Sequence, residues 1–168
     1  MDDEIKYINY WNDVSPREIV YWSALHDYYL TDEQIGQMID QTPVCVATWT
    51  RKDGSPCAAT MYHVRLDDTI YLTTTEGQAK AAAWRRNPLA SVAWWGMEGA
   101  AHARGRMELV KDPALRRRVL EAMGKKLFPD DAARYGKFLR AIDAPDRVTV
   151  KVVPDKIATF AASLIPRD

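Results

Sequence analysis

The sequence contains little of what marks several common classes of protein. Its 168 residues include only two cysteines, Cys45 and Cys57, and neither has a histidine at metal-ligand spacing, which argues against a zinc site or a disulfide framework. Lysine plus arginine and aspartate plus glutamate both number 23, so no basic excess exists to attract nucleic acid. No run approaches the roughly 18 apolar residues of a membrane span. We therefore expect a cytoplasmic protein with neither a nucleic-acid nor a membrane partner.

Several catalytic motifs are also missing. The sequence has no Gly-x-Ser-x-Gly and no His-Glu-x-x-His, and neither His26 nor His102 adjoins a recognisable nucleophile motif. It also lacks a Walker loop and a dinucleotide-binding glycine fingerprint. Hydrolase chemistry therefore has no support, and any phosphate site must be built in another way.

Two capping patterns are present in the first forty residues. Ser15-Pro16-Arg17-Glu18 and Thr31-Asp32-Glu33-Gln34 each combine a cap residue with an acidic or amide side chain three positions later. Ile35, Met38 and Ile39 then form one apolar face. We predict two helices here, and therefore an N-terminal helical arm over residues 1–42.

From Pro43 onward the periodicity becomes that of strands. β-Branched runs separated by turn residues predict strands over residues 44–50, 57–66 and 69–75, 89–95 and 101–110, and 147–153 and 156–162. Helices are expected over residues 79–86, about 112–126 and about 131–142. Because short turns cannot join parallel strands, we predict a mainly β single domain over residues 43–168, an antiparallel barrel with peripheral helices.

The segment from Thr69 to Pro88 carries the clearest chemical signal. A threonine-rich strand end passes through Glu76-Gly77-Gln78 into a helix that begins at Ala79-Lys80. Backbone N–H groups at a helix N-terminus, together with hydroxyl groups and a lysine, can hold a phosphate. A solvated lysine on an ordinary helix explains the same residues equally well.

Two other strands offer candidate ligand contacts. In Thr60-Met61-Tyr62-His63, alternate side chains must face opposite sides of the strand, and a flat heteroaromatic ring could lie along its edge. For His63 alone, a structural histidine is the commoner case. Trp94 and Trp95 also face opposite sides, so one of them must find a ligand, a partner subunit or solvent.

Taken together, the order of these motifs resembles that of the split-barrel flavoproteins related to pyridoxamine 5'-phosphate oxidase. The resemblance covers about residues 43–112 and rests on Ala47-Thr48-Trp49 with Asp53-Gly54, Thr60-Met61-Tyr62-His63, Ile70-Tyr71-Leu72-Thr73-Thr74, Lys80 through Arg85-Arg86-Asn87-Pro88, and Arg104-Gly105-Arg106-Met107-Glu108-Leu109. It implies an antiparallel split β-barrel that binds flavin mononucleotide (FMN) at a homodimer interface.

Carried over position by position, the resemblance also implies a set of cofactor-binding residues. The flavin ring would lie against Thr60, Met61, Tyr62 and His63, the ribityl-phosphate would approach Thr73 and Thr74, and the phosphate would bind Gln78 and Lys80. The activity implied is a flavin-dependent oxidoreductase acting on a small-molecule substrate, with no catalytic residue assigned.

Two alternatives keep the fold and change the function. The first is a reductase that uses the deazaflavin coenzyme F-420, whose polyanionic tail could bind Arg85, Arg86 and Arg104. The second is a non-catalytic flavin- or haem-binding protein. It is favoured by Ala79, because the family often has an arginine at this point of the phosphate helix.

Overall fold

The computed structural model describes residues 6–7, 20–21, 29–97 and 99–161 of the chain. The elements are, in chain order, β1 (Lys6–Tyr7), β2 (Val20–Tyr21), α1 (Asp32–Gln41), β3 (Val44–Thr50), β4 (Pro56–Leu66), β5 (Thr69–Thr75), α2 (Ala79–Arg86), β6 (Leu89–Gly96), β7 (Gly99–Val110), α3 (Pro113–Leu127), α4 (Ala132–Ile142) and β8 (Arg147–Phe160). None of the helices described is long and apolar enough to cross a bilayer.

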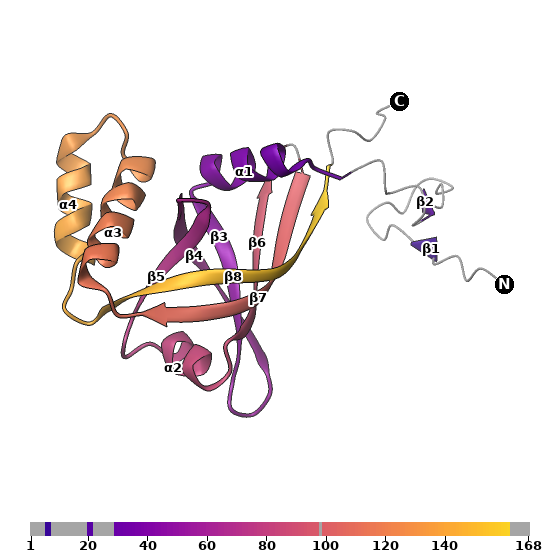
Figure 1. Cartoon of the computed structure of the whole chain (residues 1–168), viewed down its shortest axis with the longest axis horizontal. Coiled ribbons are helices and arrows are strands. Elements are labelled where there is room, and N and C mark those ends of the chain that lie inside the picture. The colour runs from indigo at the N-terminus through magenta and orange to yellow at the C-terminus, as the bar shows by residue number, and fades with distance from the viewer. Residues whose placement is uncertain (1–5, 8–19, 22–28, 98, 162–168) are drawn as a thin grey trace, which may run out of the picture.

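Six strands form a closed antiparallel barrel in the order β3-β4-β5-β8-β7-β6. The helices lie at its periphery, with α1 at one end, α2 at the opposite end, and the α3–α4 pair beside β4 and β5 (Figure 1). Asp67 and Asp68 both adopt positive φ in the turn between β4 and β5, as a tight hairpin requires. The predicted mainly β split barrel with peripheral helices is confirmed.

The core fills the inside of the barrel. Side chains along β7 alternate strictly between buried and exposed from Gly99 to Glu108, as expected of a strand with one face inward. Trp94 on β6 is fully buried, whereas Trp95 is 52% exposed, so the predicted division of this pair between the two faces is confirmed. Trp84 of α2 closes one end of the core, and its Nε1 donates to the Thr48 carbonyl at 2.9 Å.

The N-terminal helix predictions have different outcomes. The capping box at Thr31 is confirmed, because its hydroxyl accepts from the Gln34 N–H and the Gln34 side chain accepts from the Thr31 N–H. Residues Val20–Tyr21 pair with Lys6–Tyr7 as two short strands, not as part of a helix. The capping pattern at Ser15 lies outside the described residues. Met38 and Ile39 of α1 join the barrel core, so this helix packs on the barrel.

In the C-terminal region, the structure corrects one predicted strand boundary. Two strands were expected around Pro154-Asp155, but residues Arg147–Phe160 form a single strand. The register between β7 and β8 shifts between Arg104 and Gly105, so that Gly105 lies opposite Pro154, Arg104 lies opposite Lys156, and Asp155 between them has no partner. A bulge is a place where a strand tolerates proline, which has no N–H. Glycine is required there, because a Cβ at Gly105 would lie 2.1 Å from the Val153 carbonyl oxygen.

Candidate functional site

The first half of β4 has an open edge. Residues 63–66 of β4 pair with β5, whereas residues 56–62 pair only with β3 in the described part of the chain. Beyond the His63–Leu72 pair the two strands separate, and we call residues 56–62 the β4 edge. Backbone N–H and C=O groups on an unpaired strand edge need partners, so a flat ligand with donors and acceptors can bind along it.

The beginning of α2 follows the end of β5 after a short turn. Thr74, which is buried, donates from its Oγ1 to Oε1 of Gln78 at 2.7 Å. Gln78 is the N-cap residue, but its side chain makes no hydrogen bond to the helix. The N–H of Ala81 already donates to the Gln78 carbonyl at 3.0 Å, so those of Ala79 and Lys80 are the first-turn donors without an acceptor in the helix, and together with the helix dipole they favour an anion at this point.

Two cations accompany this helix N-terminus. Lys80 lies in the first turn of α2, and burial, with a smaller effect from the positive charge of Arg147, lowers its pKa below the usual value. Arg147 is the first residue of β8 and pairs with Thr75 of β5. Its Nε donates to the Ile142 carbonyl at 2.8 Å. Its own pKa is lowered mainly by burial. An anion between the two would relieve their repulsion.

Sequence reasoning missed Arg147. It lies 67 positions after Lys80, and only the antiparallel pairing of β5 with β8 brings it to the end of β5. The sequence placed Arg147 at the start of a predicted strand, but it did not show that this strand lies beside the one that ends at Thr75. Arg147 is thus a second cation close enough to Lys80 for its charge to act on it.

The four predicted residues of β4 divide between two faces. Thr60 and Tyr62 are exposed on the outside of the barrel, and the Tyr62 ring meets the Phe138 ring edge-on at 6.4 Å between centroids. Met61 and His63 point inward and are buried. Any contact from positions 61 and 63 to a ligand on the outer face must therefore come from their backbone.

His63 is held in a fully buried position. Its Nε2 lies 2.8 Å from the Ile39 carbonyl and 3.1 Å from Nζ of Lys126, which also donates to that carbonyl. Burial lowers the pKa of His63 to about 4. The ring is therefore neutral near pH 7, and in this position it cannot donate a proton to a substrate.

The threonines of β5 also separate. Thr73 pairs with Thr149 of β8, whereas Thr74 on the other face bonds to Gln78. Thr73 is largely buried, at 9% exposure. The structure therefore joins Thr74 to Gln78, while Thr73 lies on the same face of β5 as Thr75 and the Arg147 that pairs with it.

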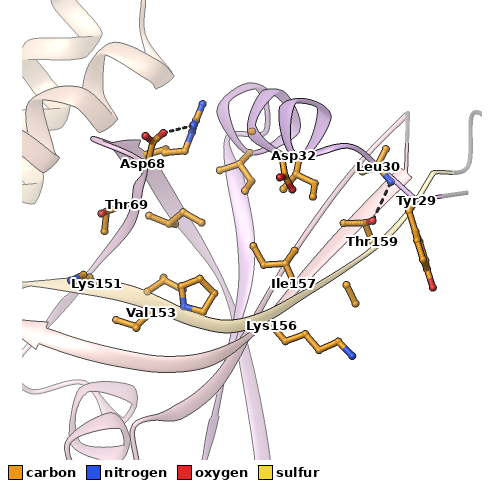
Figure 2. Close-up of a pocket in the computed structure, with 18 residues that line it drawn as sticks. Tyr29, Leu30, Asp32, Asp68, Thr69, Lys151, Val153, Lys156, Ile157 and Thr159 are labelled. Carbon is orange, nitrogen blue, oxygen red and sulfur yellow. Dashed lines mark hydrogen bonds and ion pairs between the residues drawn. The ribbon is translucent and has the colours of Figure 1, made fainter. Parts of the chain in front are cut away.

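A second candidate site is a cavity of about 840 Å³ under α1. It lies where β8 extends beyond its last pair with β5, so that residues 153–160, the β8 edge, pair only with β7 in the described part. Figure 2 shows Ile157 and Thr159 rising from β8 towards α1, with Thr159 bonded to the N–H of Leu30 and Asp68 paired at the far rim. None of the eight predicted site residues lines this cavity.

The basic residues suggested for a polyanionic tail are partly engaged. Arg85 forms an ion pair with Glu76, and Arg86 donates to the Thr50 carbonyl at 2.7 Å. Lys111 adds a second ion pair to Glu76 at 3.3 Å. Of the three arginines, Arg104 alone has neither kind of partner in the described part of the chain.

The closed antiparallel barrel with a helix N-terminus beside an unpaired strand edge defines a split-barrel protein. A family model described as pyridoxamine 5'-phosphate oxidase matches residues 31–161, which is most of the chain. The chain belongs to the pyridoxamine 5'-phosphate oxidase family, and the resemblance inferred from its motifs is confirmed.

Solved structures share this fold at low sequence identity. A conserved hypothetical protein from Mycobacterium tuberculosis is 19% identical with a TM-score of 0.74, over 84% of this chain and 92% of that one. A candidate pyridoxamine 5'-phosphate oxidase from Listeria innocua is 24% identical with a TM-score of 0.60, over 76% and 95%. An FAD and haem binding protein from Mycobacterium smegmatis is 16% identical with a TM-score of 0.63, over 82% and 74%. No curated protein sequence matches the chain.

Proposed function

We propose that the chain binds FMN along the β4 edge and acts as a flavin-dependent oxidoreductase on a small-molecule substrate. One observation carries most of this proposal: where β5 separates from β4 it leaves an open edge on β4, which suits a flat ring, and β5 itself leads into a helix N-terminus with two cations, which suits a phosphate. When bound, the flavin supplies hydride transfer at its N5 atom, and the protein supplies binding and orientation.

At the phosphate end, the residues have complementary tasks. Lys80 and Arg147 supply positive charge, and the first-turn N–H groups of α2 supply donors. Because Oε1 of Gln78 accepts from Thr74, the amide NH2 of Gln78 remains able to donate to a phosphate oxygen. Thr73 lies on the face of β5 that carries Thr75 and, across the strand pair, Arg147, so its side chain remains part of the proposal.

At the ring end, the contacts come from β4. Thr60 and Tyr62 present their side chains outward, Met61 contributes backbone groups along the edge, and His63, which pairs with Leu72, marks the end of the edge. The proposal assigns no nucleophile and no general acid to this strand or to α2. The role of the protein is therefore to hold the ring and shape the substrate pocket beside it.

A homodimer is part of the proposal. The outward faces of β4, β6 and β8 carry large exposed apolar side chains, with Tyr62 48%, Trp95 52% and Phe160 36% exposed. Cross-strand pairs connect these residues through β3 and β7 into one continuous face. Apolar surface of this kind favours association, and a second copy would also enclose the outer side of the β4 edge.

The engaged state of Arg85 and Arg86 favours FMN over the deazaflavin. A polyanionic tail would have to displace Glu76 from Arg85 and the Thr50 carbonyl from Arg86, at a cost in existing hydrogen bonds. FMN requires only the cations at α2 and β8. A non-catalytic flavin carrier would use the same binding site.

The test is a visible spectrum of the purified protein after incubation with FMN and removal of the excess. We expect one bound flavin per subunit. A colourless protein that retains none would contradict the proposal and leave the deazaflavin or a non-catalytic role as the explanation.

A further inference from the structure

The outer face of β7 carries a group of cations set by strand register. Arg104 of β7 lies directly opposite Lys156 of β8, and Arg106 follows two residues along on the same exposed face. Side chains directly opposite in an antiparallel pair have Cβ atoms about 5 Å apart, so like charges there destabilise the sheet. The group Arg104, Arg106 and Lys156 is called the cation row below.

The cation row has no counter-charge within the described part of the chain. Six other arginines, Arg65, Arg85, Arg116, Arg117, Arg118 and Arg134, form ion pairs, but no member of the row does. The next outward residue of β7, Glu108, lies opposite Lys151 in the following row. Asp155, in the bulge beside Lys156, also forms no ion pair among these residues.

Protection of a sheet edge does not account for these charges. A lysine such as Lys156 on the β8 edge discourages pairing with other chains. Arg104 and Arg106, however, stand on β7, which pairs along its length with both β6 and β8. Their repulsion therefore lowers the stability of the sheet without protecting an edge. A destabilising arrangement of this kind marks a functional position.

The bulge brings the row into its present alignment. The register shift between Arg104 and Gly105 lets the strand continue past Pro154 and sets Lys156 opposite Arg104. Bulges commonly re-aim a side chain next to a binding site. Exposed Leu89, which lies opposite Arg106 on β6, adds apolar surface at one end of the row.

We propose that the cation row is an anion-binding site, separate from the β4 edge, for a small molecule with two neighbouring anionic groups, either phosphates or carboxylates. Arg104 and Lys156 would share one group, and Arg106 would bind the second. Guanidinium groups suit both chemistries because their paired N–H donors match carboxylate and phosphate oxygens. The bound anion removes the repulsion that the free protein carries.

This site makes two predictions of opposite sign, measured on the full chain. Without ligand, Arg104→Gln should raise the melting temperature by about 1–3 °C, because the like-charge pair is lost. With ligand, calorimetric titration should show that Arg104→Gln Lys156→Gln binds inorganic pyrophosphate or succinate at least about tenfold more weakly than the wild type. Tighter binding of pyrophosphate would identify a phosphate ligand, and tighter binding of succinate a carboxylate.

Two control variants isolate the row. Arg51→Gln Lys52→Gln removes the same charge from the exposed β3–β4 turn and should leave both anion affinities within about twofold of the wild type, at matched ionic strength. Lys80→Ala should retain anion binding at the row, whatever its effect on FMN. Equal affinity in the row and turn variants, loss of all anion binding in Lys80→Ala, or dissociation of a dimer on changing the row would each overturn the proposal.

Discussion

Two of the unpaired strand edges in the described part of the barrel differ in how their cations are paired. Beyond the β4 edge, β5 leads to Lys80 and Arg147, which form no ion pair among the described residues, although the carboxylate of Asp146 acts on Arg147. The β8 edge borders a cavity whose one arginine, Arg65, is paired with both Asp40 and Asp68. The first site has two cations available for a phosphate at a helix N-terminus, whereas in the second the arginine charge is neutralised by the fold and the cations left without an ion pair among the described residues are Lys151 and Lys156 of β8.

Cavity size and phosphate-binding chemistry point to different places in this fold, and the proposed function follows the second. The larger hollow lies under α1, but its lining is mostly aliphatic and its arginine anchors that helix. The β4 edge offers unpaired backbone groups, and β5 leads from it to the two cations Lys80 and Arg147. Chemistry that recognises a phosphate is therefore the better guide to function.

The largest expected effect comes from removing the anchor of α2. Trp84→Ala should lower the free energy of unfolding by about 3–5 kcal/mol, because the fully buried ring contacts Trp49 edge-on and bonds to the Thr48 carbonyl. Urea unfolding followed by circular dichroism measures this change. Trp84→Phe keeps most of the packing and should cost only about 1–3 kcal/mol. A loss below 1 kcal/mol for Trp84→Ala would show that α2 is positioned by other contacts.

Acidification should weaken the α1 end of the barrel. Burial holds the folded-state pKa of His63 at about 4 against an ordinary value of 6.5, so the unfolded chain binds more protons between these values. The stability contributed by neutral His63 is complete above pH 6.5 and is lost as the pH falls through 4, at about 1.4 kcal/mol per pKa unit.

The measurement is urea unfolding between pH 7.5 and 4.5 for the wild type and His63→Gln. Glutamine can still donate to the Ile39 carbonyl but does not titrate, so its stability should fall less steeply with acid. Parallel curves for the two proteins would assign the acid sensitivity to other groups.

The smallest effect is expected at the β8 edge. Arg65→Gln breaks two partly exposed ion pairs with Asp40 and Asp68 and should cost at most about 1 kcal/mol of stability. Flavin fluorescence titration should give an FMN affinity within twofold of the wild type, because this residue stands away from α2. A tenfold loss of affinity would place the cofactor near α1 and reverse the comparison.

Local signals in the sequence were enough for most of the barrel. Asp53-Gly54, Asp67-Asp68 and Asn87-Pro88 mark turns by backbone chemistry, so strands β3 to β6 and α2 have nearly their predicted bounds. The error at Pro154 arose because proline ordinarily ends a strand. The compensating glycine lies on the partner strand, at Gly105, and sequence position alone does not connect the two.

Side-chain direction and distant partners were less predictable. Alternation along β4 grouped Met61 with His63 and Thr60 with Tyr62, but it could not say which pair faces the core. Arg147 joins Lys80 only through the strand order of the closed barrel. At the proposed phosphate site, the sequence therefore predicted Lys80 but not Arg147.

The central claim is that Lys80 recognises the phosphate of a flavin, and one thermodynamic cycle tests it directly. The affinities of FMN and riboflavin, which lacks the phosphate, are measured for the wild type and for Lys80→Ala. We expect the substitution to weaken FMN binding by about 10- to 100-fold, the value of a charge-assisted hydrogen bond, and to leave riboflavin binding within about twofold. An equal loss for both ligands, or no loss for either, would contradict the claim.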